Sequence, residues 1–121
     1  MAANIQVIPA KLADYLLEDT SVNGTVVYGV SGAATMYQVR INNTSGAAVF
    51  LKFWDATSGV TVGTTDPVIV LKCPASSART YNCLEGMHAL GTGMAYACVT
   101  AGGTAGTTNP AATVDIRVQY D

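Results

Sequence analysis

The sequence predicts an all-β protein, an antiparallel β-sandwich of seven or eight short strands preceded by an N-terminal arm. Apolar and polar residues alternate along several segments, as they do on strands that bury one face. Turn-forming residues separate these segments at short intervals. Glycine accounts for 12 of 121 residues and only 12% of residues are charged, so residues that fill helix surfaces are scarce. Because alternation does not reveal strand order, jelly-roll and immunoglobulin-like arrangements both stay open.

Length and composition also exclude several classes of protein. A chain of 121 residues is enough for one domain. Half of its residues are hydrophobic, yet no apolar run approaches the ~20 residues that a membrane-spanning helix needs, so we expect no membrane partner. The formal net charge is -2, and no cluster of basic residues is present to neutralise phosphates. We therefore expect no nucleic-acid partner.

Residues 1–22 form the expected arm, and residues 23–121 form the expected sandwich domain. Pro9 suits the first turn of a helix, and Leu12, Tyr15 and Leu16 follow it at helical spacing, which predicts one short, marginal helix. Such a helix needs another surface to pack on. The apolar residues of the arm are Ile5, Val7, Ile8, Leu12, Tyr15 and Leu16.

The first strands of the sandwich are expected at residues 25–30 and 35–42. Alternation in the second of these segments gives two faces: Tyr37, Val39 and Ile41 on one, and Met36, Gln38, Arg40 and Asn42 on the other. A turn-rich stretch at residues 42–46 leads to a further strand at residues 47–55. We interpret these two strands as a β-hairpin with a loop longer than two residues.

The strand at residues 47–55 has two apolar faces. Val49, Leu51 and Phe53 lie on one face, and Phe50, Lys52 and Trp54 on the other. The second face is too apolar to be simply solvated. Two explanations stay open: Phe50 and Trp54 meet a partner, or they pack beneath a loop or the N-terminal segment of the same chain.

The remaining chain continues the pattern of strands and loops. Residues 56–66 form an expected loop before a strand that places Ile69, Leu71 and Cys73 on one side and Val68, Val70 and Lys72 on the other. Further strands are expected at residues 78–83, 94–100 and 114–120. In the second of these, Ala95 and Ala97 are small enough to allow close packing between sheets. Residues 101–111 are expected to form a mobile hairpin loop.

The sequence predicts no catalytic, cofactor or metal site, and we expect the chain not to be an enzyme. Cys73, Cys83 and Cys98 form no CxxC pair, and the only co-ligand is His88, so the cysteines are expected to be buried thiols in a reducing compartment. His88 follows Glu85 at a spacing that joins them only on a helix, and no G-x-S-x-G motif is present. No secretory signal precedes the domain, which indicates synthesis in a cytoplasm.

Several segments resemble small virion proteins of tailed bacteriophages. Residues 49–56 match a strand of the form hydrophobic-Lys-hydrophobic-aromatic-Asp, and residues 62–71 match a strand start of the form Val-Gly-Thr-x-x-Pro-Val. A glycine-rich strand at residues 91–100, a Thr/Gly-rich loop and the final strand at residues 114–120 are also similar. The resemblance covers about Val49 to Asp121, and neither the arm nor the three cysteines belong to it.

This resemblance implies a structural component of the virion, and we expect a capsid decoration (cement) protein. Such a protein is synthesised in the cytoplasm of the bacterial host and lies on the capsid surface, where it binds the major capsid protein. Low charge and surplus apolar surface favour a homo-oligomer, expected as a homotrimer, with an arm that lies across a neighbour or the shell. The expected interface residues are Ile5, Val7, Ile8, Leu12, Tyr15, Leu16, Phe50, Trp54, Val68 and Val70.

The alternative from another functional class is a receptor- or carbohydrate-binding module of a phage tail fibre. In that reading Tyr28, Trp54 and Tyr96 supply aromatic platforms for sugar rings. The loops at residues 56–65 and 101–110 would form the rim of the site. A small enzyme is a third reading, and it would require a role for His88.

Overall fold

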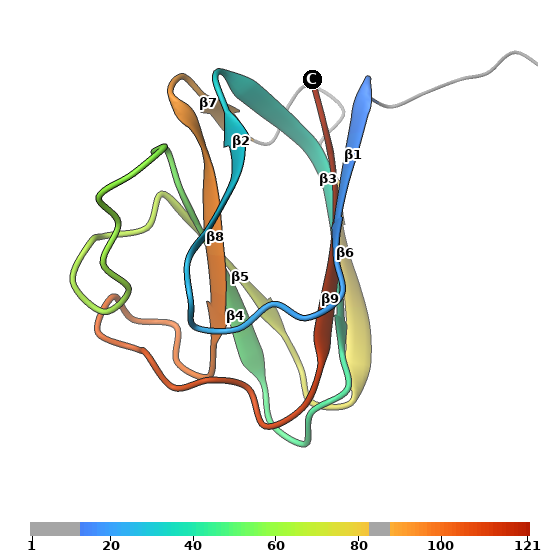
Figure 1. Cartoon of the computed structure of the whole chain (residues 1–121). Helices are drawn as coiled ribbons and strands as arrows, with labels where there is room; N and C mark the ends of the chain where they lie inside the picture. The colour runs from blue at the N-terminus through green and yellow to red at the C-terminus, as the bar shows by residue number, and fades with distance from the viewer. Residues whose placement is uncertain (1–12, 83–87) are drawn as a thin grey trace, which may run out of the picture.

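The computed structural model describes residues 13–82 and 88–121, and over these residues the chain forms nine β-strands and no helix. The strands pack as two antiparallel sheets, so the predicted β-sandwich is confirmed; Figure 1 shows the sheets as two facing layers. The strands are β1 (Tyr15–Asp19), β2 (Val27–Ser31), β3 (Ala34–Asn43), β4 (Val49–Trp54), β5 (Ile69–Cys73), β6 (Ser77–Asn82), β7 (His88–Leu90), β8 (Gly93–Val99) and β9 (Val114–Tyr120).

The strand order is that of a jelly roll. One sheet has the order β1-β9-β3-β6 and will be called sheet A; β7 also pairs with β3. The other has the order β2-β8-β4-β5 and will be called sheet B. If β6 and β7 are counted as one interrupted strand, β8 becomes strand 7 and β9 becomes strand 8. Sheet A then holds strands 1, 8, 3 and 6, and sheet B holds strands 2, 7, 4 and 5 of an eight-stranded chain. This order is the double Greek key of the jelly roll.

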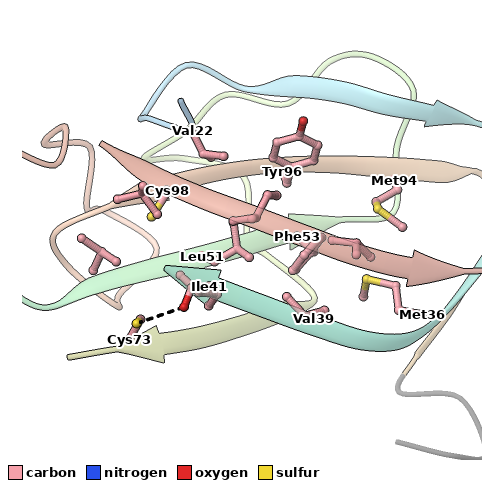
Figure 2. Close-up of a cluster of buried hydrophobic side chains, with 14 of the residues drawn as sticks. Val22, Met36, Val39, Ile41, Leu51, Phe53, Cys73, Met94, Tyr96 and Cys98 are labelled. Atoms are coloured by element: carbon pink, nitrogen blue, oxygen red, sulfur yellow. Dashed lines mark hydrogen bonds between the residues drawn. The ribbon is translucent and has the colours of Figure 1, made fainter. Parts of the chain in front are cut away.

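The core lies between the two sheets and is built from the inward-facing positions of both. Sheet B contributes Leu51 and Phe53 from β4 and Met94, Tyr96 and Cys98 from β8, all 3% exposed or less (Figure 2). The facing residues of sheet A are Ala34, Met36, Val39, Ile41, Leu90, Val114, Ile116 and Val118. Alternation with a period of two therefore identifies most of the core, because each strand buries one face.

A β-bulge shifts the predicted faces at the start of β3. Met36 pairs with Tyr120 and Gln38 pairs with Gln119, so Tyr37 is an extra residue in the strand. Strict alternation puts Tyr37 on the buried face with Val39 and Ile41, and Met36 on the solvated face. This assignment is wrong, because the bulge turns Met36 into the core with 0% exposure while Tyr37 is only partly buried.

The predicted helix near residue 15 is also wrong where the structure describes it. Residues 15–19 form β1, which pairs with β9 along its whole length. Leu17 packs against the core, and Tyr15 stacks on Tyr120 with ring centroids 5.3 Å apart. The apolar spacing fits a helix equally well, but pairing with β9 satisfies the backbone and selects the strand. Ile5, Val7, Ile8 and Leu12 lie outside the described residues.

β3 and β4 do not form the predicted hairpin, because they belong to different sheets. The chain crosses from sheet A to sheet B at residues 44–48, and the buried side chain of Asn43 holds this crossing together. Its Nδ2 donates to the carbonyl oxygens of Ala47 at 2.9 Å and Pro74 at 3.0 Å. Its Oδ1 accepts from the backbone N–H and the hydroxyl of Ser45 at 3.0 and 2.7 Å.

Replacing Asn43 by alanine is expected to lower the free energy of unfolding by about 2–3 kcal/mol, because both halves of this network lose their partner inside the protein. Urea denaturation followed by circular dichroism measures the change. The matched control is Asn42→Ala, the neighbouring asparagine on the outer face of β3, which should stay within about 0.5 kcal/mol of the parent. Equal effects at the two positions would contradict this role for Asn43.

Candidate interaction surfaces

Two loops of the same chain cover the outer face of sheet B over β4 and β8. Residues 55–68 and 100–113 both lie on this side of the sandwich (Figure 1). Trp54 is 2% exposed, and its Nε1 donates to the carbonyl oxygen of Thr65 at 2.9 Å. Ala95, Ala97, Val60 and Val62 pack around it. Of the two explanations for the second apolar face of β4, packing beneath a loop of the same chain is therefore the one observed for Trp54.

The second loop is held by Lys52, whose side chain is buried on the same face. Its Nζ donates to the carbonyl oxygen of Gly103 at 2.6 Å and, more weakly, to that of Gly106 at 3.5 Å. Burial lowers the pKa of Lys52 below its ordinary value. The expected hairpin loop at residues 101–111 is a crossing between sheets, because β8 and β9 lie in sheets B and A respectively.

Asp55, the last residue of the Lys-hydrophobic-aromatic-Asp motif, also holds a loop. The Asp55 carboxylate accepts the backbone N–H groups of Gly91, Thr92 and Gly93 at 3.1, 2.8 and 3.2 Å. Lys52, Trp54 and Asp55 each hold a loop by hydrogen bonds. This shared role explains why a lysine, an aromatic residue and an aspartate occur close together at the end of one strand. The small side chains of Ala95 and Ala97 leave room for Trp54 on the outer face, so the expectation that they allow close packing between sheets is wrong.

Two of the three proposed sugar platforms are buried. Trp54 lies beneath its loop, and Tyr96 points into the core, where its hydroxyl donates to Asp19 Oδ2 at 2.8 Å. Burial, with Asp19 as a second cause, raises the pKa of Tyr96. Tyr28 is 41% exposed, and its hydroxyl accepts the backbone N–H of Val60 at 3.0 Å. The described structure therefore offers no aromatic sugar platform that combines these three residues.

Exposed apolar side chains lie at opposite sides of the sandwich. β1 and β2 are the edge strands of one side, and β5 and β6 are those of the other. The first side carries Tyr15 and Leu16 on β1 and Val27 and Tyr28 on β2, which will be called the β1/β2 patch. Within it, Leu16 lies on the outer face of sheet A, opposite Gln119, and Tyr28 lies on the outer face of sheet B, opposite Ala95. The second carries Val68 and Val70, which are 46% and 38% exposed and will be called the β5 patch. Phe50 is only partly buried near this patch, with the ammonium of Lys72 5.9 Å from its ring centroid.

Apart from Leu16, the outer face of sheet A is polar, and no described loop covers it (Figure 1). The outward positions of β9 and β3 hold polar residues, among them Arg117, Gln119, Arg40 and Gln38. These residues are adjacent only because β9 lies between β1 and β3. Alternation alone predicts that Gln38, Arg40 and Asn42 share one face of their strand. Joining them to β9 requires the strand order, which alternation does not reveal.

Groups that could support catalysis are few in the described residues. Cys73 and Cys98 are buried free thiols, as predicted, and Cys83 and Glu85 lie outside the described residues. His88 lies on β7, where its backbone is opposite Met36. Among the residues that the structure describes, no group of three His, Cys, Asp or Glu side chains is arranged to hold a metal ion. A pocket of about 220 Å³ at residues 21–23 and 109–113 has no ionisable side chain in its lining.

Comparisons with known proteins do not assign a family. No protein-family model, no curated protein and no solved structure matches the chain. Within residues 13–82 and 88–121, no helix has the length and apolarity needed to cross a membrane.

Proposed function

We propose that this chain is a structural protein of a bacteriophage virion that assembles with copies of itself and binds the capsid as a decoration protein. The observation that carries the proposal is the pair of exposed apolar patches, one on each side of the sandwich. Exposed apolar side chains on the edge strands of a sheet are typical of interaction surfaces. The resemblance of residues 49–121 to small phage virion proteins supplies the capsid as the partner.

The position of the patches favours a ring of subunits. A two-fold dimer joins one patch to its own copy, so it would leave the other patch of each subunit exposed. A head-to-tail contact places the β1/β2 patch of one subunit against the β5 patch of the next and buries both. Such a contact closes into a ring when the rotation between neighbours is suitable, and a homotrimer is the smallest ring. Trp54 takes no part in this interface because its own loop covers it.

Sedimentation velocity on the purified chain tests the interface. We expect a trimer for the parent protein and a monomer for Val70→Glu, because the subunit contact would have to remove the added carboxylate from water. The matched control is Thr80→Glu, which adds the same charge at an exposed position of β6 and should leave the trimer intact. A parent protein that is monomeric at micromolar concentration would contradict the homo-oligomer.

Co-sedimentation with expanded phage capsids that lack small accessory proteins tests the capsid partner. We expect saturable binding at a stoichiometry set by the capsid symmetry. The role of the arm is tested by deleting residues 2–12, because a longer deletion to residue 19 would remove β1 from sheet A. The shortened chain should keep its β-sheet circular dichroism spectrum and lose capsid binding. Full binding by the shortened chain would refute the role of the arm, and no binding by the parent would refute decoration.

A further inference from the structure

Three rows of side chains cross the outer face of sheet A, and they differ in how well their members are paired. In the first row, Gln119 Nε2 donates to Gln38 Oε1 at 3.0 Å, and Gln38 Nε2 donates to Asn82 Oδ1 at 2.7 Å. These three amides form a continuous chain of hydrogen bonds across β9, β3 and β6. This row needs no further partner to be stable.

The neighbouring positions are not paired in this way. Arg40 lies directly opposite Arg117, and Asn42 lies directly opposite Asp115. Arg117 forms an ion pair with Glu18 at 2.8 Å, but no side-chain hydrogen bond or ion pair joins Arg40, Asn42 or Asp115 to any described residue. Like charges directly opposite each other destabilise a sheet, so the fold gains nothing from placing these two arginines together.

These four residues line a depression of about 80 Å³ on the outer face. Asp115 Oδ1 is buried in the side-chain packing and has no hydrogen-bond partner. A buried acceptor without a partner is uncommon in folded proteins and is costly unless something else supplies the donor. The depression therefore combines a carboxylate, which can only accept hydrogen bonds, with the guanidinium of the exposed residue Arg40, which can only donate them.

This combination restricts the chemistry of a ligand. An ionised carboxylate only accepts hydrogen bonds and a guanidinium only donates them, whereas the Asn42 amide does both. A phosphate or sulfate would satisfy Arg40 but would repel Asp115. A hydroxyl group donates and accepts at once, so two adjacent hydroxyls satisfy Asp115 and Arg40 together. The formal charges of Arg40, Arg117, Asp115 and Glu18 also cancel, which favours a neutral ligand.

We propose that the depression formed by Arg40, Asn42, Asp115 and Arg117 binds a neutral saccharide through a pair of adjacent hydroxyl groups. None of these four residues belongs to either apolar patch, although Leu16 of the β1/β2 patch lies on the same face of sheet A, opposite Gln119. Arg40 and Asp115 contact the two hydroxyls, and Asn42 completes the hydrogen bonding. The hydrogen bond to Glu18 holds the Arg117 guanidinium toward β1. The small depression has no aromatic platform, so the dissociation constant for one sugar ring is on the order of 1 mM.

Nuclear magnetic resonance on the full ¹⁵N-labelled chain tests the site. The probes are the methyl glycosides of galactose, glucose, mannose and rhamnose, with sodium phosphate as the charged comparison. We expect saturable shifts for at least one glycoside, confined to the amides around residues 40–42 and 115–117, and no such shifts with phosphate. No saturable shift with any of the four glycosides at about 100 mM would overturn the proposal, as would tighter binding of phosphate at the same amides.

Two variants and one control give this experiment its specificity. Asp115→Asn keeps the size of the side chain but weakens its acceptor, and Arg40→Gln removes the guanidinium; each is expected to weaken glycoside binding at least about 10-fold. Arg79→Gln removes the same charge from an exposed position of β6 and should leave binding unchanged. The amide spectrum reports whether each variant is folded. Folded Asp115→Asn protein with unchanged affinity would overturn the assignment of this depression.

Discussion

Replacing Trp54 by alanine is expected to lower the free energy of unfolding by about 3–5 kcal/mol, the range for truncating a large buried aromatic residue. Trp54 is 2% exposed and packs against both alanines of β8 and the two valines of the covering loop. Its Nε1 hydrogen bond to Thr65 is lost in the same variant. The loop would lose its main attachment to sheet B.

Urea denaturation at several protein concentrations measures this effect apart from association, because an obligate oligomer would show concentration-dependent stability. Trp54→Phe keeps most of the apolar contact and loses the hydrogen bond, so it should cost about 1–2 kcal/mol. Val70→Ala is the comparison on the exposed strand and should change folding stability by no more than about 0.5 kcal/mol. A Trp54→Ala protein of parental stability that only fails to associate would place this side chain in an interface after all.

The second large effect is a loss of stability in alkaline solution, caused by buried groups that keep their protons. Burial, reinforced by the nearby Cys73, raises the pKa of the Cys98 thiol from 9.0 to about 12. The pKa of Cys73 and that of Tyr96 are also raised, chiefly by burial. Between pH 9 and pH 12 the unfolded chain releases the Cys98 proton while the folded chain retains it. Stability is therefore full below pH 9 and falls as the pH rises.

The Cys98 thiol alone gives a loss of about 3 kcal/mol at about pH 11, since each pH unit between the two pKa values contributes about 1.4 kcal/mol. Lys52 acts in the opposite direction, because its lowered pKa lets the folded chain release a proton first. Urea denaturation at about pH 8 to about pH 11 under reducing conditions measures the sum.

The control for the alkaline effect is Cys98→Ala. This variant should be less stable than the parent near neutral pH by about 1 kcal/mol, because it leaves a small cavity. Its stability should depend less steeply on pH above 9, since the thiol that holds its proton is gone. Parallel curves for the parent and the variant would show that the buried thiol is not the cause.

How much of the fold could be predicted depended on whether a feature is local. Alternation located most strands because each one buries a face against the same core, and this holds for β9 as clearly as for β5. Partners of strands are not local, so β3 and β4 were joined as a hairpin although each pairs with other strands. The spacing of Leu12, Tyr15 and Leu16 suits two kinds of structure, and only the presence of β9 decides between them for residues 15–19.

The surfaces were harder to predict than the core. The sequence indicated correctly that the second face of β4 is not solvated, but the covering loops are rich in glycine and threonine and give little sign that they pack. The carbonyl groups that hold Lys52 belong to the backbone and leave no signal in the sequence. The proposed saccharide site combines residues 40 and 42 with residues 115 and 117, so it is visible only after the strand order is known.

The place of β9 in the middle of sheet A also constrains when the protein can fold. β9 lies between β1 and β3, although it follows all the other described strands in the sequence. Until residues 114–120 leave the ribosome, β1 has no partner in the sheet, and β3 exposes an edge that could pair with other chains. Contacts this distant in sequence also slow folding, because a long segment must be closed before they form. Sheet A is therefore completed only after residues 114–120 have been made, and premature termination before residue 114 should yield an aggregation-prone product.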